Sequence, residues 1–200
     1  MPYTYWEYFL SIEEDLLKTA RYVEFHQDNY SVYSIEFALI LLASCSEIDT
    51  IAKLLYSPSP SQIRNGKDWR NIADHKKGIY EDQYHKFPTQ KINIPRYELT
   101  LSPWSEWAEG NNRPSWWESY NAVKHRRNEA YNEATLENTL NSVAGLLCIV
   151  LYYYLCIEKV NPPSSTNLLF PKYYVEGVIP GGFSMSWEGH IPDPHRGVIM

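Results

Sequence analysis

Two long apolar segments limit the folds that this sequence can adopt. Residues 31–56 include SIEFALILLASCSEIDTIAKLL, which is apolar on nearly every face of a helix. Residues 143–157, VAGLLCIVLYYYLCI, are shorter than the roughly 20 residues that a membrane span needs. A helix that is apolar all round belongs in the interior of a protein. Both segments therefore predict central helices of a mainly α, globular protein, and we expect no membrane partner.

The remaining apolar periodicity predicts an up-and-down bundle of about five helices. Apolar residues recur at three- and four-residue steps over 4–28, and again along a long helix over 130–159. A more polar helix is expected over 66–86. Another is expected over 115–128, ahead of the last long helix. Packing amphipathic helices around two apolar ones is the arrangement of a helical bundle.

Two stretches depart from helical character. Residues 91–104, KINIPRYELTLSPW, are β-branched and alternating, so they predict an extended, β-like insertion with one or two short strands at an edge. The last 40 residues hold six of the 13 prolines and five of the nine glycines, and 173–187 alternates like a hairpin. We therefore expect a helical bundle over 1–160 and an irregular, Pro/Gly-rich C-terminal arm over 161–200.

Charge and cysteine content argue against several classes of function. A net charge of −6 disfavours nonspecific binding of nucleic acid by the whole surface, but it allows a local basic patch. Cys45, Cys148 and Cys156 are odd in number and form no CxxC, which predicts buried free thiols in a reducing compartment. The chain starts without a basic leader, so we expect a cytoplasmic protein. The sequence contains no glycine-rich phosphate loop and no Gly-x-Ser-x-Gly, and we expect no metal or cofactor.

The candidate site lies in the segment WWESYNAVKHRR. At about 100° per residue, Asn121, Lys124 and His125 fall on one arc of a helix, with Arg127 beside them, whereas Tyr120 falls on the core side. An imidazole titrates near neutral pH and can transfer protons. Neighbouring cations can stabilise the negative charge that develops on a phosphodiester. The segment therefore predicts a metal-independent site for RNA, whose own 2′-hydroxyl can be the nucleophile.

The spacing Asn121-x-x-x-His125 resembles the HEPN superfamily of small helical bundles, whose usual signature is R-N-x-x-x-H ahead of a last apolar helix. The wider sequence is similar to a group of uncharacterised bacterial proteins. The resemblance implies a homodimer, and active HEPN members are endoribonucleases of toxin–antitoxin and phage-defence systems. It implies that His125 is a general acid or base, that Asn121 orients the phosphate or the imidazole, and that Lys124 and Arg127 stabilise charge. Tyr120 stands where the motif has Arg, which puts catalysis in doubt.

Two alternatives stay open beside the endoribonuclease. One is a decayed relative that binds RNA or a nucleotide. The other is a non-catalytic helical module that binds a protein partner in a defence or toxin–antitoxin assembly. A second stretch, Arg70-Asn71 followed by His75, also spells R-N-x-x-x-H, and it is a rival for the true motif.

The helix predicted over 31–56 also places an acid on an apolar stripe. Glu47 lies three or four residues from apolar neighbours on both sides. A carboxylate in such surroundings is costly unless it is paired. The cations of the WW segment are its natural partners, so we predict a contact between Glu47 and His125 that orients the imidazole.

Overall fold

A computed structural model describes residues 3–162, 166–171, 177–178 and 184–185 of the chain. The α-helices in this part are α1 (Thr4–Thr19), α2 (Ile35–Leu55), α3 (Ile72–His75), α4 (Ser105–Ala108), α5 (Ser115–His125), α6 (Arg127–Ala130) and α7 (Leu136–Tyr152). Two π-helical segments continue α3 and α7, over Lys76–Glu81 and Tyr153–Glu158. Single 3-10 turns lie at Gln27–Asn29, Pro60–Gln62, Phe87–Thr89, Pro95–Tyr97 and Tyr131–Glu133. The predicted mainly α fold is confirmed.

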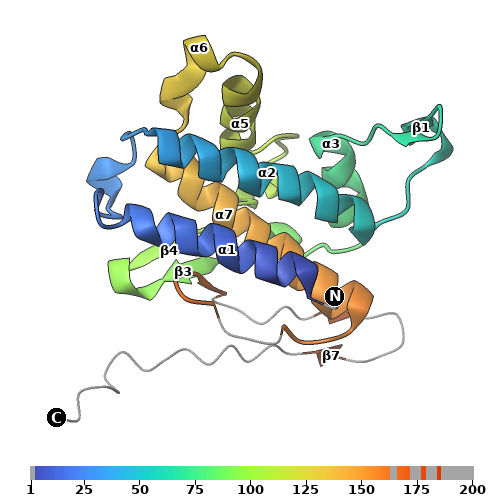
Figure 1. Cartoon of the computed structure of the whole chain (residues 1–200). Coiled ribbons are helices and arrows are strands. Elements are labelled where there is room, and N and C mark those ends of the chain that lie inside the picture. The colour runs from blue at the N-terminus through green and yellow to red at the C-terminus, as the bar shows by residue number, and fades with distance from the viewer. Residues whose placement is uncertain (1–2, 163–165, 172–176, 179–183, 186–200) are drawn as a thin grey trace.

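The two apolar segments form the two longest helices, and α2 and α7 pack most extensively on each other. α1 runs antiparallel to α2, and α1, α2 and α7 lie side by side (Figure 1). Both central helices begin at a hydroxyl cap: the Ser34 side chain accepts from the Phe37 N–H, and the Thr135 side chain accepts from the Asn138 N–H. Such caps satisfy backbone donors that a helix start leaves unpaired.

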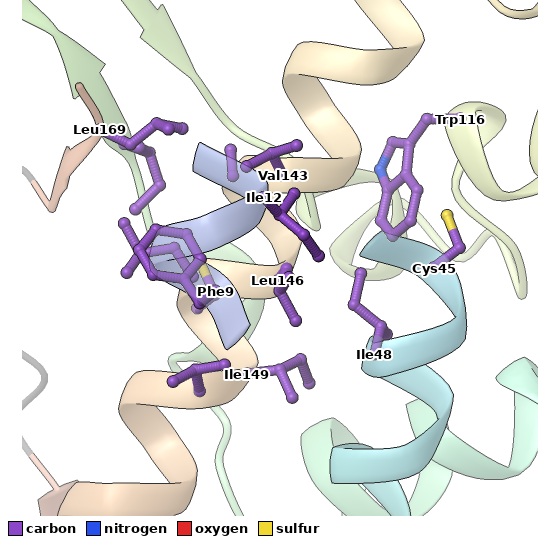
Figure 2. Close-up of a cluster of buried hydrophobic side chains, with 14 of the residues drawn as sticks. Phe9, Ile12, Cys45, Ile48, Trp116, Val143, Leu146, Ile149 and Leu169 are labelled. Carbon is purple, nitrogen blue, oxygen red and sulfur yellow. The ribbon is translucent and has the colours of Figure 1, made fainter. Parts of the chain in front are cut away.

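The interior is built from side chains of all four longer helices. Figure 2 shows Phe9 and Ile12 of α1 on one side of α7, and Ile48 of α2 with Trp116 of α5 on the other. Trp116 is buried, and its indole N–H donates to the Pro103 carbonyl at 2.7 Å. Trp117 is also buried, so both tryptophans of the pair belong to the core.

The helix over Leu136–Glu158 is long and apolar enough to cross a membrane by length and composition alone. However, 78% of its most apolar window is buried inside the protein. The segment is therefore the core helix of a globular domain, as its short apolar run predicted.

Three small antiparallel sheets, with four strand pairs between them, accompany the helices in the described residues. The strands are β1 (Ile63–Arg64), β2 (Lys67–Asp68), β3 (Ile92–Ile94), β4 (Leu99–Leu101), β5 (Phe170–Pro171), β6 (Gly177–Val178) and β7 (Ser184–Met185). The two short strands predicted in the insertion are confirmed, but β3 lies between β4 and β5 in one sheet, so only β4 is at the predicted edge. β6 pairs with β7, as the predicted hairpin requires, but much of the C-terminal arm lies outside the described residues.

A buried carboxylate joins the C-terminal arm to the bundle. Glu13 of α1 is fully buried, and its two oxygens accept from the backbone N–H groups of Asn167, Leu168 and Leu169 at 2.8 to 3.0 Å. A carboxylate that accepts several backbone donors is well stabilised in an interior. The segment 166–171 is therefore fastened to α1 on one side and to β3 on the other.

Several predicted helix limits are wrong. The last long helix, predicted from residue 130, begins at Leu136, because a 3-10 turn over Tyr131–Glu133 precedes its Thr135 cap. The first helix ends at Thr19 instead of residue 28, and the Thr19 hydroxyl donates back to the Leu16 carbonyl, a local bond that competes with continued helix. The polar helix over 66–86 shrinks to α3 and its π-helical continuation, because a β1–β2 turn with Asn65 and Gly66 at positive φ occupies its start. The helix over 115–128 ends at His125, since Arg126 has non-helical angles (φ −138°, ψ 43°).

Candidate functional site

Helix α5 carries the candidate segment and is fixed at its start by an acid from α4. Glu106 accepts from both the backbone N–H and the hydroxyl of Ser115 at 2.8 Å. A carboxylate at this position satisfies the first free donors of the helix and complements its dipole. The core side of α5 is the one that the sequence predicted, because Tyr120 and Val123 are buried. The opposite side of the helix is left to form a site.

A cleft of about 450 Å³ lies between α2, the start of α3 and α5. Its walls are Ser46, Asp49 and Thr50 of α2, Arg70, Asn71 and Ile72 at the start of α3, Arg113 before α5, and Trp117, Tyr120, Asn121 and Lys124 of α5. The volume is within the range of sites that hold one small ligand. The cleft therefore joins residues of both candidate motifs, which lie some 50 positions apart in the chain.

The open cations of the cleft are Lys124 and Arg113. Lys124 donates to the Tyr120 hydroxyl at 3.1 Å, and its Nζ lies 5.2 Å from the centre of the same ring. Among the described residues, neither cation forms an ion pair with an acid, and both side chains are exposed. Tyr120, which occupies the place of the motif Arg, thus positions a lysine one turn further along the helix.

Asn121 lines the cleft beside Lys124 and is half-buried. The imidazole of His125 is not part of the lining; it is the last residue of α5 and is exposed. Arg127 opens α6, and it is likewise exposed and outside the lining. The structure therefore brings together the amide and the amine of the predicted set, and leaves the imidazole and the guanidinium on the neighbouring surface.

The side chains of the rival motif bond to other groups within the protein. The Arg70 side chain is buried and donates to both Asp68 oxygens and to the carbonyls of Tyr56 and Lys53, at 2.6 and 2.9 Å. It thereby caps the last turn of α2, whose carbonyls have no helical partner. The Asn71 side chain accepts from the N–H groups of Ala73 and Asp74 and so caps α3.

His75, the third member of the rival motif, is fully buried below the cleft. Its Nδ1 lies 2.9 Å from the Tyr56 hydroxyl, and its Nε2 lies 3.1 Å from Oδ1 of Asp49. The other Asp49 oxygen accepts from Lys53 at 2.5 Å. Burial alone would raise the pKa of Asp49, but the hydrogen bonds and charges of His75 and Lys53 outweigh it, so the pKa is lowered. The cleft thus has an ionised carboxylate in its wall.

The predicted contact between Glu47 and His125 is not made. Within the described part of the chain, Glu47 has no hydrogen-bond or ion-pair partner, and partial burial raises the pKa of its carboxyl. Asp49 lies about 200° further around the helix, on the side that faces the cleft. The acid of α2 that takes part in the cleft is therefore Asp49 instead of Glu47.

Sequence reasoning missed several residues of the cleft. Ser46, Asp49 and Thr50 stand at three- and four-residue spacing, so a helical wheel of α2 could have shown them as one polar face. Arg113 lies in the loop before α5, where periodicity gives no signal. Its place in the cleft follows only from the way the chain folds.

Comparisons of this chain with protein-family models, with curated proteins and with solved structures find no match. The HEPN resemblance therefore depends on the spacing of Asn121 and His125 and on their place before the last apolar helix. Among the described residues, no group of three or more His, Cys, Asp or Glu side chains is arranged to hold a metal ion.

Proposed function

We propose that this chain is an RNA-directed, HEPN-like protein that binds RNA phosphate groups in the cleft between α2 and α5. The observation that carries the proposal is the pair of open cations, Lys124 and Arg113, beside the Asn121 amide in one cleft. Cations that no acid neutralises attract phosphate, and amide side chains donate hydrogen bonds to its oxygens. The negative net charge of the chain confines this attraction to a local patch.

The composition of the lining supports binding more than cleavage. A general acid or base must come within hydrogen-bond reach of the proton that it transfers. Among the described residues, His75 is the imidazole that bonds to a cleft side chain, Asp49, and it is sealed in the interior with both nitrogens at hydrogen-bond distance from partners. His125 lies outside the lining. The geometry therefore favours the decayed, RNA-binding form of the HEPN resemblance.

A neighbouring cleft adjoins the first one at Arg113. It has a similar volume, about 450 Å³, and is lined by Ala73, Glu106, Asn111, Asn112, Arg113, Ser115 and Glu118. Arg113 belongs to both clefts. The acids Glu106 and Glu118 of the neighbouring cleft would repel a second phosphate, so we assign the phosphate to the cleft between α2 and α5.

Binding of a fluorescein-labelled RNA hexamer, measured by anisotropy at several salt concentrations, tests the proposal. We expect Lys124→Ala to weaken binding about five- to tenfold and to reduce the slope of log affinity against log salt by about one, the effect of losing one phosphate contact. Lys91→Ala is the matched control, because Lys91 is an exposed lysine outside both clefts. Equal affinities of wild type and Lys124→Ala would contradict the proposal.

A second candidate is a metal-independent endoribonuclease, and the exposure of His125 next to Lys124 favours it. A second copy of the chain in a homodimer could complete such a site with its own cations. Cleavage of total RNA in EDTA by wild type and by His125→Ala is the test. Cleavage that depends on His125 would replace the binding proposal, whereas equal and negligible cleavage by both would exclude the nuclease.

A further inference from the structure

The carboxylate of Asp49 restricts which ligand can occupy the cleft. The side chain is 35% exposed, and it lines the cleft together with the cations Lys124 and Arg113. Because its pKa is lowered, the group is negatively charged at neutral pH. A ligand that is only anionic would be repelled by it. The cleft therefore fits a ligand that carries a negative group at one end and hydrogen-bond donors at the other.

The Asp49 carboxylate can still accept hydrogen bonds from such a ligand. One oxygen accepts from His75 and the other from Lys53. An ionised carboxylate has about four acceptor positions, so two of them stay available. The side exposed to the cleft is where a ligand hydroxyl could reach them.

The groups behind Asp49 hold it in one orientation. Since an ionised carboxylate only accepts, His75 donates to it from Nε2, and its Nδ1 lies at hydrogen-bond distance from the Tyr56 hydroxyl. His75 is fully buried, and Tyr56 is half-buried beneath the Arg70 guanidinium, which lies 4.5 Å from the centre of its ring. A carboxylate fixed by a buried chain of hydrogen bonds has little orientational freedom to lose when a ligand binds.

We propose that Asp49 reads the ribose of a bound nucleotide, so that the cleft selects ribonucleoside phosphates over their 2′-deoxy forms. Resting on the proposed function, this inference assigns the phosphate to Lys124 and Arg113 and the ribose 2′-hydroxyl to Asp49. Asp and Glu side chains bind ribose 2′-hydroxyls in this way, and the 2′-hydroxyl is the group by which proteins tell RNA from DNA. His75 and Tyr56 are positioning residues, because they act on the ligand only through Asp49.

Calorimetric titration with AMP and with 2′-deoxy-AMP tests this assignment on the wild-type chain. We expect AMP to bind about tenfold more tightly, the effect of one hydrogen bond to a charged group. Anisotropy with an RNA hexamer and a DNA hexamer of the same sequence repeats the comparison for a chain, and it distinguishes a free nucleotide from RNA as the source of the bound unit. Equal affinity for ribo and deoxy ligands would overturn the assignment.

Asp49→Asn then asks whether Asp49 causes the preference. We expect the ratio of ribo to deoxy affinity to fall below about twofold, because the charged acceptor of the 2′-hydroxyl is lost. Asp82→Asn is the matched control, since Asp82 is exposed and outside the cleft. A ribose preference that survives Asp49→Asn would overturn the proposal. So would a preference for GMP over AMP that Asp49→Asn abolishes, because Asp49 would then read the base.

The outcomes separate the two proposals. If wild type binds neither AMP nor RNA, the proposed function fails and the ribose assignment fails with it. A different result is that wild type binds both AMP and RNA and that Lys124→Ala lowers both affinities. If ribo and deoxy ligands then bind with equal affinity, only the ribose assignment fails. If Asp49→Asn does not fold, the wild-type comparison of AMP with 2′-deoxy-AMP still tests the ribose preference, and equal affinities still overturn the assignment.

Discussion

The segments around Arg70 and around Lys124 each contain a cation, an asparagine and a histidine, but they differ in burial. Arg70 and His75 are buried, and their polar atoms are taken up by partners within the chain. Lys124 is exposed, and it donates a hydrogen bond to the Tyr120 hydroxyl. The first segment therefore stabilises the junction of α2 and α3, and the second is free to bind a ligand.

The comparison separates a match in sequence from the ability to bind a ligand. A side chain can bind a ligand only if its hydrogen-bonding groups are not already satisfied within the protein. Arg70 matches the HEPN signature literally, yet its guanidinium is committed to Asp68 and to two carbonyls at the end of α2. Asn121 and His125 match it without the Arg, yet Asn121 lines a cleft together with Lys124. A group whose donors are already satisfied inside the protein has little left to offer a phosphate.

The largest effect that would test this contrast is the loss of the Arg70 side chain. Arg70→Ala leaves Asp68 and two helix-end carbonyls without their donor, so we expect the free energy of unfolding to fall by about 3 to 4 kcal/mol. Urea denaturation followed by circular dichroism measures the change. Arg64→Ala is the control, because Arg64 is exposed on β1. A loss below about 1 kcal/mol would mean that Arg70 is not a structural residue.

The two histidines provide a second, smaller contrast. His75→Ala removes a fully buried ring together with its bonds to the Tyr56 hydroxyl and to one oxygen of Asp49, so we expect a loss of about 2 to 3 kcal/mol. His125→Ala changes an exposed side chain, and we expect a difference within about 0.5 kcal/mol. Thermal and urea unfolding of both variants provide the comparison. Equal losses of unfolding free energy in the two variants would contradict the difference between the buried and the exposed segment.

The smallest effect is the pH dependence of the Asp68–Arg70 pair. The hydrogen bond from Arg70 is the main cause that lowers the pKa of Asp68 to about 2. Because this folded-state pKa lies below the unfolded value near 4, the stabilisation is complete above about pH 4 and is lost as the pH falls toward 2. Asp68 is partly exposed, so solvent screens the pair, and we expect it to contribute about 1 kcal/mol.

Urea denaturation of wild type and Asp68→Asn at pH 6 and pH 3 checks this expectation. The difference in the free energy of unfolding between the two proteins should be near 1 kcal/mol at pH 6 and about half of that at pH 3. Asp82→Asn, which changes an exposed acid outside the pair, should show no such trend. A difference that grows as the pH falls would have the wrong sign for a lowered pKa.

The helical class and the central elements could be predicted from the sequence because buried helices and strands have recognisable apolar patterns. The apolar runs of α2 and α7 specify buried helices wherever they are placed, and alternation in 91–104 specifies short strands. The side of α5 that packs inward also follows from its own periodicity, which is why Tyr120 and Val123 were assigned correctly to the core side. These features depend on residues close together in the chain.

The site depended on contacts between residues that are far apart. The acceptors of the Arg70 guanidinium at the end of α2 lie 14 and 17 positions earlier in the chain, and no periodicity reports them. Only the part of α5 that faces α2 lines the cleft. Lys124 therefore lines it, whereas His125, about 100° further around the helix, does not. Local patterns determine which residues form a helix and which side of it is buried. Packing between helices alone decided which polar groups became satisfied and which stayed open to a ligand.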